Sequence, residues 1–221
     1  VEDLAALVDP PPALARPLAP AGQVYALPKG LSLAQGASLP INSFTALYGL
    51  EDCIDIAPGE RMLVLGGGGG VGTAAIAVAK ALGAWVIAGA SSSAKAQAAR
   101  SAGADAVVNP HLHSFRDDLK AALRGEALTV VYDPVGGSFS EAAFRSLSPG
   151  GRHLVVGFAS GTIPKLPLNL ALLKRSSVVG VDWGGAMRAD PTLNPRLAAR
   201  LRALLESGAL TSPPVDARPL E

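Results

Sequence analysis

The sequence predicts an α/β protein whose six strands form one doubly wound parallel sheet in the order 3-2-1-4-5-6. Two observations lead to this prediction. Short apolar segments alternate with helical segments of about ten residues, as they do when right-handed helical crossovers join parallel strands. In addition, the stretch RMLVLGGGGGVGTAAIAVAK, residues 61–80, joins a buried strand to a helix through a run of glycines, the place where such a sheet binds its ligand.

Each strand is expected where a short run of β-branched or other apolar residues lies between turn residues. Pro58-Gly59-Glu60 is a turn that leads into the first strand, and the same pattern recurs along the chain. Residues 23–27 are a further candidate strand upstream, followed by a turn at residues 29–32. The six strands of the sheet are expected at residues 62–65, 84–88, 106–108, 128–132, 152–156 and 177–181.

Helices are expected between these strands, where apolar residues recur at helical spacing and glycine or proline ends the segment. Gly103 ends one such helix, Pro149 stops another, and Gly208 follows the last, amphipathic one. Besides the helix after the glycines, the expected helical segments are residues 37–54 (mostly helical, broken near Pro40), 92–102, 115–123, 138–147, 168–174 and 195–207.

The composition excludes several classes of protein. Apolar residues make up 49% of the 221 residues, and the formal net charge of +1 argues against a nucleic-acid binder. The single cysteine excludes a disulfide framework and a cysteine-cluster zinc site. Residues 62–79 are uncharged, but the central glycines make them a poor spanning helix. We therefore expect a soluble protein without a signal peptide, located in the cytoplasm, with no membrane partner.

The glycine run predicts a dinucleotide-binding site. Gly67, Gly69 and Gly72 fit the pattern G-x-G-x-x-G between a strand and a helix. In this pattern the glycines allow a tight turn and a close approach of the backbone to a pyrophosphate, which then lies at the helix N-terminus beside Gly70 and Val71. The alternative, a flexible glycine linker, is disfavoured because apolar segments flank the run on both sides.

The residues after the second strand favour NADPH over NADH. No Asp or Glu occurs between Arg61 and Ala104, so the acidic acceptor for a ribose 2′-hydroxyl is missing. Ser91, Ser92 and Lys95 occupy that region and suit a 2′-phosphate, since hydroxyls donate to it and an ammonium neutralises it. The alternative is that the serines only cap the next helix while Lys95 is a solvated charge; both roles are compatible.

Residues 22–221 resemble the zinc-independent quinone oxidoreductase (zeta-crystallin-like) branch of the medium-chain dehydrogenase/reductases. This resemblance implies NADPH-dependent hydride transfer to quinones or to the C=C bond of α,β-unsaturated carbonyls. The segments that carry it are LPINSFTALYGL (39–50), LGGGGGVGTAAIAVAKALGAWVI (65–87), VVYDPVGG (130–137), GGRHLVVGFASG (150–161) and PLNLALLKRSSVVGVDWG (167–184).

The resemblance also implies a division of the chain, because members of this branch begin with a β-rich GroES-like domain that is mostly missing here. Residues 1–21, with five prolines, are expected to be irregular. Residues 22–55 would be the remnant of that domain with connecting helices, residues 56–211 the Rossmann domain, and residues 212–221 the start of the segment that returns to the catalytic domain.

By the same resemblance, Asn42 and Thr45 would lie near the nicotinamide. No general acid stands out; the candidate catalytic residues are Asn42, Thr45 and Asp133, while the catalytic residue itself is unknown and no metal is expected. His111, His113 and His153 are expected at the surface or at strand ends. Many members of this branch carry a tyrosine just after the third strand that helps to hold the 2′-phosphate, where this chain has Asn109-Pro110-His111. The residues expected to edge the cofactor cleft are Asp133, Val135, Gly157, Phe158 and Ala159, with Val181 and Trp183 at its nicotinamide end.

Two further expectations concern partners and alternatives. The sixth strand would form an exposed apolar edge, and the resemblance implies a homodimer that continues the sheet across this edge. The substrate would be a small quinone or enone. An NADPH-binding module without turnover, lacking its substrate domain, is the principal alternative, and a Rossmann-type methyltransferase is the third.

Overall fold

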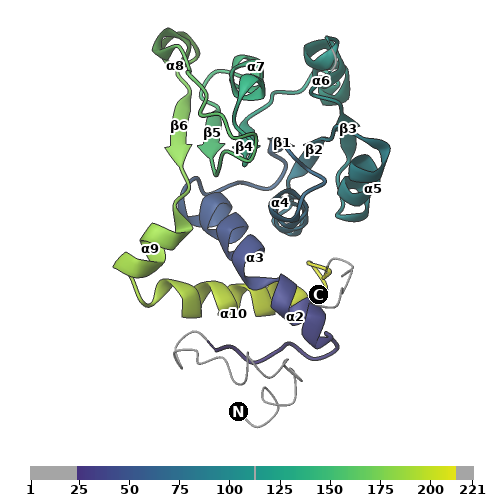
Figure 1. Ribbon diagram of the computed structural model, residues 1–221, viewed down its shortest axis with the longest axis vertical. Coiled ribbons are helices and arrows are strands. Elements are labelled where there is room, and N and C mark those ends of the chain that lie inside the picture. The colour runs from purple at the N-terminus through teal and green to yellow at the C-terminus, as the bar shows by residue number, and fades with distance from the viewer. Residues whose placement is uncertain (1–23, 112, 213–221) are drawn as a thin grey trace.

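The computed structural model describes residues 24–111 and 113–212, which form a six-stranded parallel sheet between two layers of helices (Figure 1). The strand order is β3-β2-β1-β4-β5-β6, and every neighbouring pair is parallel. This confirms the predicted fold class and strand order. The strands are β1 (Arg61–Val64), β2 (Trp85–Gly89), β3 (Ala106–Val108), β4 (Val130–Asp133), β5 (Arg152–Val155) and β6 (Ser177–Gly180).

Figure 1 shows α6, α7 and α8 on one side of the sheet and α3, α4 and α10 on the other. The helices that precede the sheet are α2 (Leu33–Ser38), α3 (Pro40–Leu47) and the π-helix η3 (Tyr48–Asp52). Those that follow are α4 (Gly70–Ala81), α5 (Ser93–Ser101), α6 (Phe115–Leu123), α7 (Ser138–Ser146), α8 (Leu168–Lys174), α9 (Trp183–Ala189) and α10 (Leu193–Glu206).

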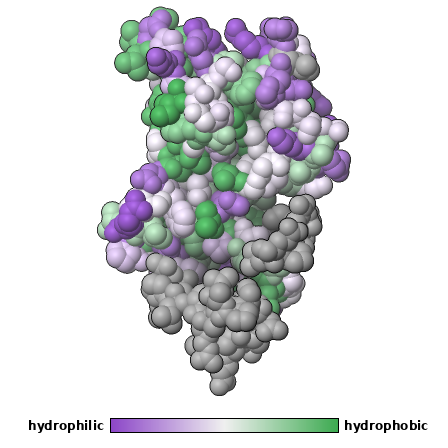
Figure 2. All heavy atoms as spheres, viewed as in Figure 1, coloured by the Kyte–Doolittle hydropathy of each residue, from purple (hydrophilic) through white to green (hydrophobic). Residues whose placement is uncertain are grey.

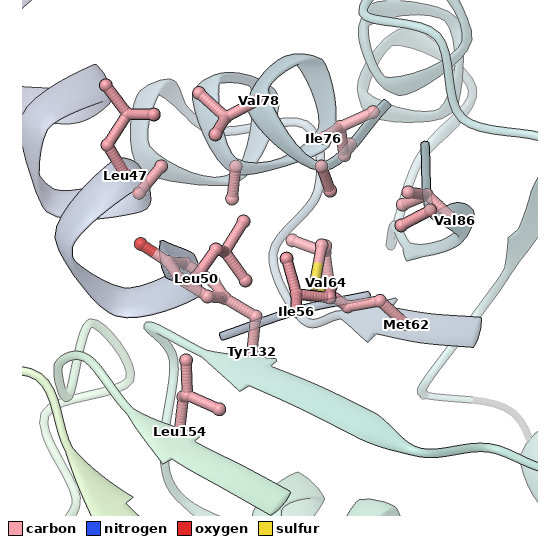
Figure 3. Close-up of a cluster of buried hydrophobic side chains, with 14 of the residues drawn as sticks. Leu47, Leu50, Ile56, Met62, Val64, Ile76, Val78, Val86, Tyr132 and Leu154 are labelled. Carbon is pink, nitrogen blue, oxygen red and sulfur yellow. The ribbon is translucent and has the colours of Figure 1, made fainter. Parts of the chain in front are cut away.

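Two apolar cores lie on the two faces of the sheet because successive side chains of a strand point to opposite faces. In β1, Met62 and Val64 join the core beneath α3, α4 and α10, whereas Leu63 joins the core beneath α6 and α7. Figure 3 shows the first core around Tyr132, with residues from α3, η3, α4 and four strands. The central strands β1, β2 and β4 are covered on both faces and are mainly apolar rather than alternating, as in other buried parallel sheets.

Residues upstream of β1 belong to the first of these cores. The predicted helical stretch 37–54 is confirmed in outline as α2, α3 and η3, with the break at Leu39, directly before Pro40 at the first position of α3. Phe44, Leu47 and Leu50 are at most 2% exposed and pack with residues of β1 and α4. The boundary drawn between residues 55 and 56 stays a prediction.

Three local features differ from the sequence-based expectations. Residues 24–27 of the expected strand 23–27 have no regular structure, and Tyr25 instead packs its ring edge-on against Phe44. The helix α9 was not expected, because WGGAMRA contains two glycines; the side chain of Asp182 accepts a hydrogen bond from the N–H of Gly185 and caps it. The π-helical geometry of η3 was not foreseen either. Gln23 and the segments 1–22 and 213–221 lie outside the described residues.

Among the described residues, no helix is both long and apolar enough to cross a membrane.

Candidate functional site

A cleft of about 480 Å³ lies at the carboxyl ends of the strands, where β1 adjoins both β2 and β4. This is the switch point at which open α/β sheets bind ligands. Its walls come from the glycine loop, the loops after β2 and β3, and the loops after β4 and β5. The lining residues are Leu65, Gly66, Gly69, Gly70, Val71, Gly72, Gly89, Ala90, Ser91, Lys95, Pro110, His111, Pro134, Val135, Phe139, Ala159 and Ser160.

The glycine loop is shaped by close approaches that side chains would prevent. Gly66 has a φ of +63°, which favours glycine. A Cβ at Gly67 would stand 2.7 Å from the Cβ of Ala88 on the neighbouring strand. A Cβ at Gly72 would overlap the main-chain oxygen of Gly66, so the first turn of α4 packs directly onto the loop. Side chains at Gly67 and Gly72 would therefore disturb the packing of the loop against β2 and of α4 against the loop.

The first turn of α4 presents free amide groups to the cleft. Its N-cap is Gly69, which has no side chain to cap the helix, and the first turn contains no acidic residue. Within the described part of the chain, the N–H groups of Gly70, Val71 and Gly72 donate to no carbonyl or side chain. All three residues line the cleft. Unpaired amides and the positive end of the helix dipole together make a site for an anion such as a phosphate.

Ser91 and Lys95 line the same cleft, whereas Ser92 caps the following helix. The Ser92 hydroxyl accepts a hydrogen bond from the N–H of Lys95 at 3.3 Å, so the capping alternative holds for this serine. No acidic side chain pairs with the Lys95 ammonium among residues 24–111 and 113–212. An exposed cation beside an anion site remains available for a second negative group.

His111 also faces the cleft. Its main-chain N–H donates to Oδ1 of Asn109 at 3.0 Å. Its ring lies edge-on to Phe139, with centroids 4.7 Å apart. The loop after β3 therefore reaches across the strand ends to the first turn of α7, closing one end of the cleft.

Asn42 and Thr45 lie one turn apart on α3, on the side of the glycine loop. A Cβ at Gly70 would stand 3.1 Å from Nδ2 of Asn42, so this amide lies over the start of α4. The Thr45 hydroxyl donates to the main-chain oxygen of Ile41 at 2.7 Å. Neither residue lines the cleft itself. Their predicted place beside a nicotinamide stays a prediction.

The other predicted edge residues separate into two groups. Val135 and Ala159 line the cleft, but Gly157 and Phe158 do not. Val181 is 7% exposed and belongs to the core. Trp183 donates from Nε1 to Oδ1 of Asn194 at 3.0 Å and packs edge-on against Phe44, which favours the core-packing role for this tryptophan.

Asp133 points into the protein rather than into the cleft. It is 2% exposed, and both carboxylate oxygens accept internal hydrogen bonds. This placement does not suit direct contact with a substrate. One of its neighbours is His153, which was expected at the surface or at a strand end. The surface position is wrong: His153 lies within β5, is 3% exposed and points toward α7, because it is in register with Val131 on that face. This buried pair was not predicted, because nothing in the sequence RHLVV shows that the histidine points inward.

No group of three or more His, Cys, Asp or Glu side chains among the described residues is arranged to hold a metal ion.

Residues 70–202 match the zinc-binding dehydrogenase family. Quinone oxidoreductase-like protein 2 of Bos taurus is 41% identical over 162 residues, which cover 73% of this chain and 46% of that protein. The crystal structure of Escherichia coli quinone oxidoreductase complexed with NADPH is similar with a TM-score of 0.78 at 30% identity, covering 90% of this chain and 60% of that one. The nucleotide-binding subdomain of the enoylreductase domain of PpsC from Mycobacterium tuberculosis has a TM-score of 0.67 at 26% identity, covering 79% and 97% respectively.

The chain spans about half the length of the curated relatives that it matches. The matching region extends from the first turn of α4 into α10 and so includes the glycine loop's helix and five of the six strands. The chain therefore belongs to the zinc-binding dehydrogenase family, in which its relatives are quinone oxidoreductases and enoyl reductases.

Proposed function

We propose that this chain binds NADPH in the cleft and is the cofactor-binding part of a zinc-independent oxidoreductase acting on quinones or conjugated enones. The observation that carries the proposal is that one cleft contains both the amides at the start of α4 and the Lys95 ammonium, none of which has a partner among the described residues. Two separate anion positions suit a dinucleotide that carries both a pyrophosphate and a 2′-phosphate. The NADPH complex of the similar E. coli quinone oxidoreductase supports the choice of cofactor.

The residues of this chain would divide the work of binding. The N–H groups of Gly70, Val71 and Gly72 would hold the pyrophosphate, because a helix N-terminus stabilises negative charge. Ser91 would donate a hydrogen bond to the 2′-phosphate while Lys95 neutralises its charge. The absence of an acidic residue in the first turn of α4 and in residues 85–104 removes repulsion from both positions.

The chemistry that the bound cofactor supplies is the transfer of a hydride to an electrophilic carbon. This chain would position the cofactor and shield one side of it, with Val135 and Ala159 as apolar walls. Asn42 and Thr45 on α3 would lie on the nicotinamide side, by resemblance to the family. No zinc is required, because a hydride adds to a quinone or enone in conjugation and solvent supplies the proton.

A binding module without turnover is the alternative function. It is favoured by the likeness to the nucleotide-binding subdomain of the PpsC enoylreductase domain, of which this chain covers 97%. Calorimetric titration with NADPH and NADH tests binding: we expect micromolar NADPH affinity and at least about tenfold weaker NADH, or about 1.4 kcal/mol. A panel of quinones and enones then separates the two functions. Reduction of any acceptor supports the enzyme, and binding without reduction supports the module; no binding of either cofactor refutes both.

We also propose that the chain forms a homodimer through the free edge of β6. This strand is at the end of the sheet and Val178 is 50% exposed. Beside it, Leu168, Leu172 and Leu173 of α8 are 73–80% exposed. Figure 2 shows hydrophobic side chains gathered over α8 at the upper left of the molecule. An apolar surface of this kind next to an unpaired strand edge favours pairing with another chain.

A further inference from the structure

A buried polar network lies beneath the cleft, where β4 ends and α7 begins. Oδ1 of Asp133 accepts hydrogen bonds from the main-chain N–H groups of Val135 and Gly136, at 2.9 and 2.8 Å. Oδ2 accepts one from the Ser140 hydroxyl at 2.5 Å and lies 3.2 Å from Nε2 of His153. Asp133, Ser140 and His153 are each at most 3% exposed. Because all three side chains lie in the interior, they form hydrogen bonds within the protein rather than with solvent.

The hydrogen bonds define the protonation of the network. Burial raises the pKa of Asp133, but the hydrogen bonds from His153, Ser140 and Gly136 together lower it by more. The pKa of this carboxyl is therefore below its ordinary value. A carboxylate can only accept, so His153 must donate through Nε2. Nδ1 of His153 is buried without a partner in the described structure, where a proton would be an unsatisfied donor. The imidazole therefore carries its proton on Nε2.

The two amides that Asp133 holds belong to a turn that forms one wall of the cleft. Pro134 and Val135 line the cleft, and Gly136 has a φ of +69°, so the turn is tightly bent. A Cβ at Gly66 would stand 2.7 Å from Cγ2 of Val135. The turn after β4 thus rests directly on the glycine loop, and a shift in one moves the other.

The same turn supports the loop after β5. The main-chain oxygen of Pro134 accepts a hydrogen bond from Ala159 at 3.1 Å, and that of Val135 accepts one from Ser160 at 2.9 Å. Ala159 and Ser160 are the residues of this loop that line the cleft. Asp133 therefore holds the loop after β4, which in turn is hydrogen-bonded to the loop after β5, and both loops form walls of the cleft.

We propose that Asp133 is a positioning residue for cofactor binding: held by Nε2–H of His153 and the hydroxyl of Ser140, its carboxylate fixes the loops after β4 and β5 at the spacing that admits the dinucleotide. The inference rests on the proposed function, since the ligand is NADPH. Asp133 itself would not touch the ligand, because it is 2% exposed and does not line the cleft. The loops after β4 and β5 do not include Lys95, which would bind the 2′-phosphate. Loss of the carboxylate should therefore weaken the binding of NADPH and of NADH by the same factor.

Three variants test this role by calorimetric titration at a temperature where circular dichroism shows each of them folded. Asp133→Ala removes both carboxylate oxygens, which accept the hydrogen bonds of the network. Asp133→Asn keeps an oxygen for the amides of Val135 and Gly136 but turns the other atom into a donor. Thr129→Val is the matched control, because Thr129 precedes the same strand at its opposite end, where its hydroxyl donates to the main-chain oxygen of Arg61.

We expect Asp133→Ala to raise the Kd for NADPH at least about tenfold with the NADPH-to-NADH ratio unchanged, or about 1.4 kcal/mol for each cofactor. Asp133→Asn should stay within about threefold of the wild type. Thr129→Val should lower the Tm and leave the Kd unchanged. An unchanged Kd in folded Asp133→Ala would overturn the positioning role, and so would an equal loss of affinity in Thr129→Val.

The imidazole of His153 supplies a spectroscopic readout that needs no cofactor. Nitrogen-15 NMR should show the proton on Nε2 in the wild type and on Nδ1 in Asp133→Asn, because the introduced amide donates to Nε2. A wild-type proton on Nδ1 would refute the network. If Asp133→Ala does not fold, Ser140→Ala and His153→Phe test the positioning role instead. A raised Kd for NADPH in both variants supports the role. An unchanged Kd in either variant overturns it.

The two proposals fail in different ways. If the wild type binds neither cofactor, the proposed function is refuted and the positioning role with it. If the wild type binds NADPH and Asp133→Ala binds equally well, the positioning role alone is refuted.

Discussion

The first turn of α5 packs directly on the glycine loop through Lys95 and Gly68: a Cβ at residue 68 would stand 2.5 Å from Cβ and 2.6 Å from Cα of Lys95. The obstructing atoms include main chain, which cannot swing aside. The glycine loop and the first turn of α5, which carries Lys95, therefore pack closely through a glycine that the G-x-G-x-x-G pattern leaves unspecified.

Gly68→Ala should push the start of α5 away from the loop. We expect a loss of stability of about 1–3 kcal/mol from the overpacking and a weaker affinity for NADPH. Gly69→Ala is the control for stability, since the nearest atom to its Cβ would be the Gly66 oxygen at 3.5 Å, an ordinary contact. Urea unfolding measures the first effect and calorimetry the second. Equal stability of the two variants would contradict the packing argument.

Lys95→Ala should remove the preference for NADPH. Because the ammonium has no acidic partner among the described residues, its removal should cost little stability while raising the Kd for NADPH about tenfold and leaving that for NADH unchanged. Arg100→Ala removes a charge from the other end of α5, outside the cleft, and serves as the control. An unchanged ratio of the two dissociation constants in Lys95→Ala would count against the 2′-phosphate role.

Glu60 should make stability fall in acid. Burial raises the pKa of Glu60, but hydrogen bonds from Arg152 and from the N–H of Ala57 together lower it by more. The pKa of Glu60 is therefore below its ordinary value. A carboxyl whose pKa is lowered by folding adds stability above its unfolded pKa, and this is lost as the pH falls through the folded pKa. Glu60→Gln should therefore cost about 1–3 kcal/mol at pH 7 and show a flatter decline below pH 5.

Thermal unfolding between pH 7 and pH 3 measures the Glu60 effect. Glu141→Gln is the control, since Glu141 pairs with Arg145 at the surface, where both side chains are at least 40% exposed. Parallel curves for the wild type and Glu60→Gln would show that this carboxyl has no part in acid unfolding.

Tyr132→Phe should leave the protein equally stable or stabilise it. The hydroxyl is buried beside η3 without a hydrogen-bond partner in the described structure, and burial raises its pKa (Figure 3). Removing an unsatisfied buried hydroxyl relieves a desolvation cost of about 1 kcal/mol or more. Tyr48→Phe is the control, because Tyr48 is only half-buried, whereas Tyr132 is fully buried. Destabilisation of Tyr132→Phe in urea would mean that the hydroxyl is satisfied after all.

Val178→Lys should break the proposed dimer. A charge at the free edge of β6 opposes pairing with a second copy of the chain, so light scattering should show a dimer for the wild type and a monomer for the variant at the same micromolar concentration. Leu33→Lys, at another residue with 50% exposure, should stay dimeric. A wild-type mass equal to the monomer would rule out the proposed interface.

Local sequence patterns were sufficient to predict the sheet and the position of the glycine loop before α4. Each strand contains a short run of apolar residues, and the glycines between β1 and α4 have the spacing of a tight strand-to-helix turn. Residues 106–108, 115–123 and 168–174 have the boundaries that the pattern predicts. The strand predicted at residues 23–27 is not formed at residues 24–27, because apolar alternation does not show whether a neighbouring strand exists to pair with. The helix α9 was not predicted, because it contains two glycines and the capping role of Asp182 was not recognised.

The sequence by itself determined the doubly wound sheet and the place of its glycine loop, because strand period, helix period and turn chemistry act over a few neighbouring residues. Only the tertiary structure decided what lies beneath the cleft. Asp133, Ser140 and His153 come from β4, α7 and β5, and the direction in which each side chain points depends on register and packing between elements. Such contacts between residues distant in sequence leave no local pattern, so the role of Asp133 as an internal support emerged only from the folded chain.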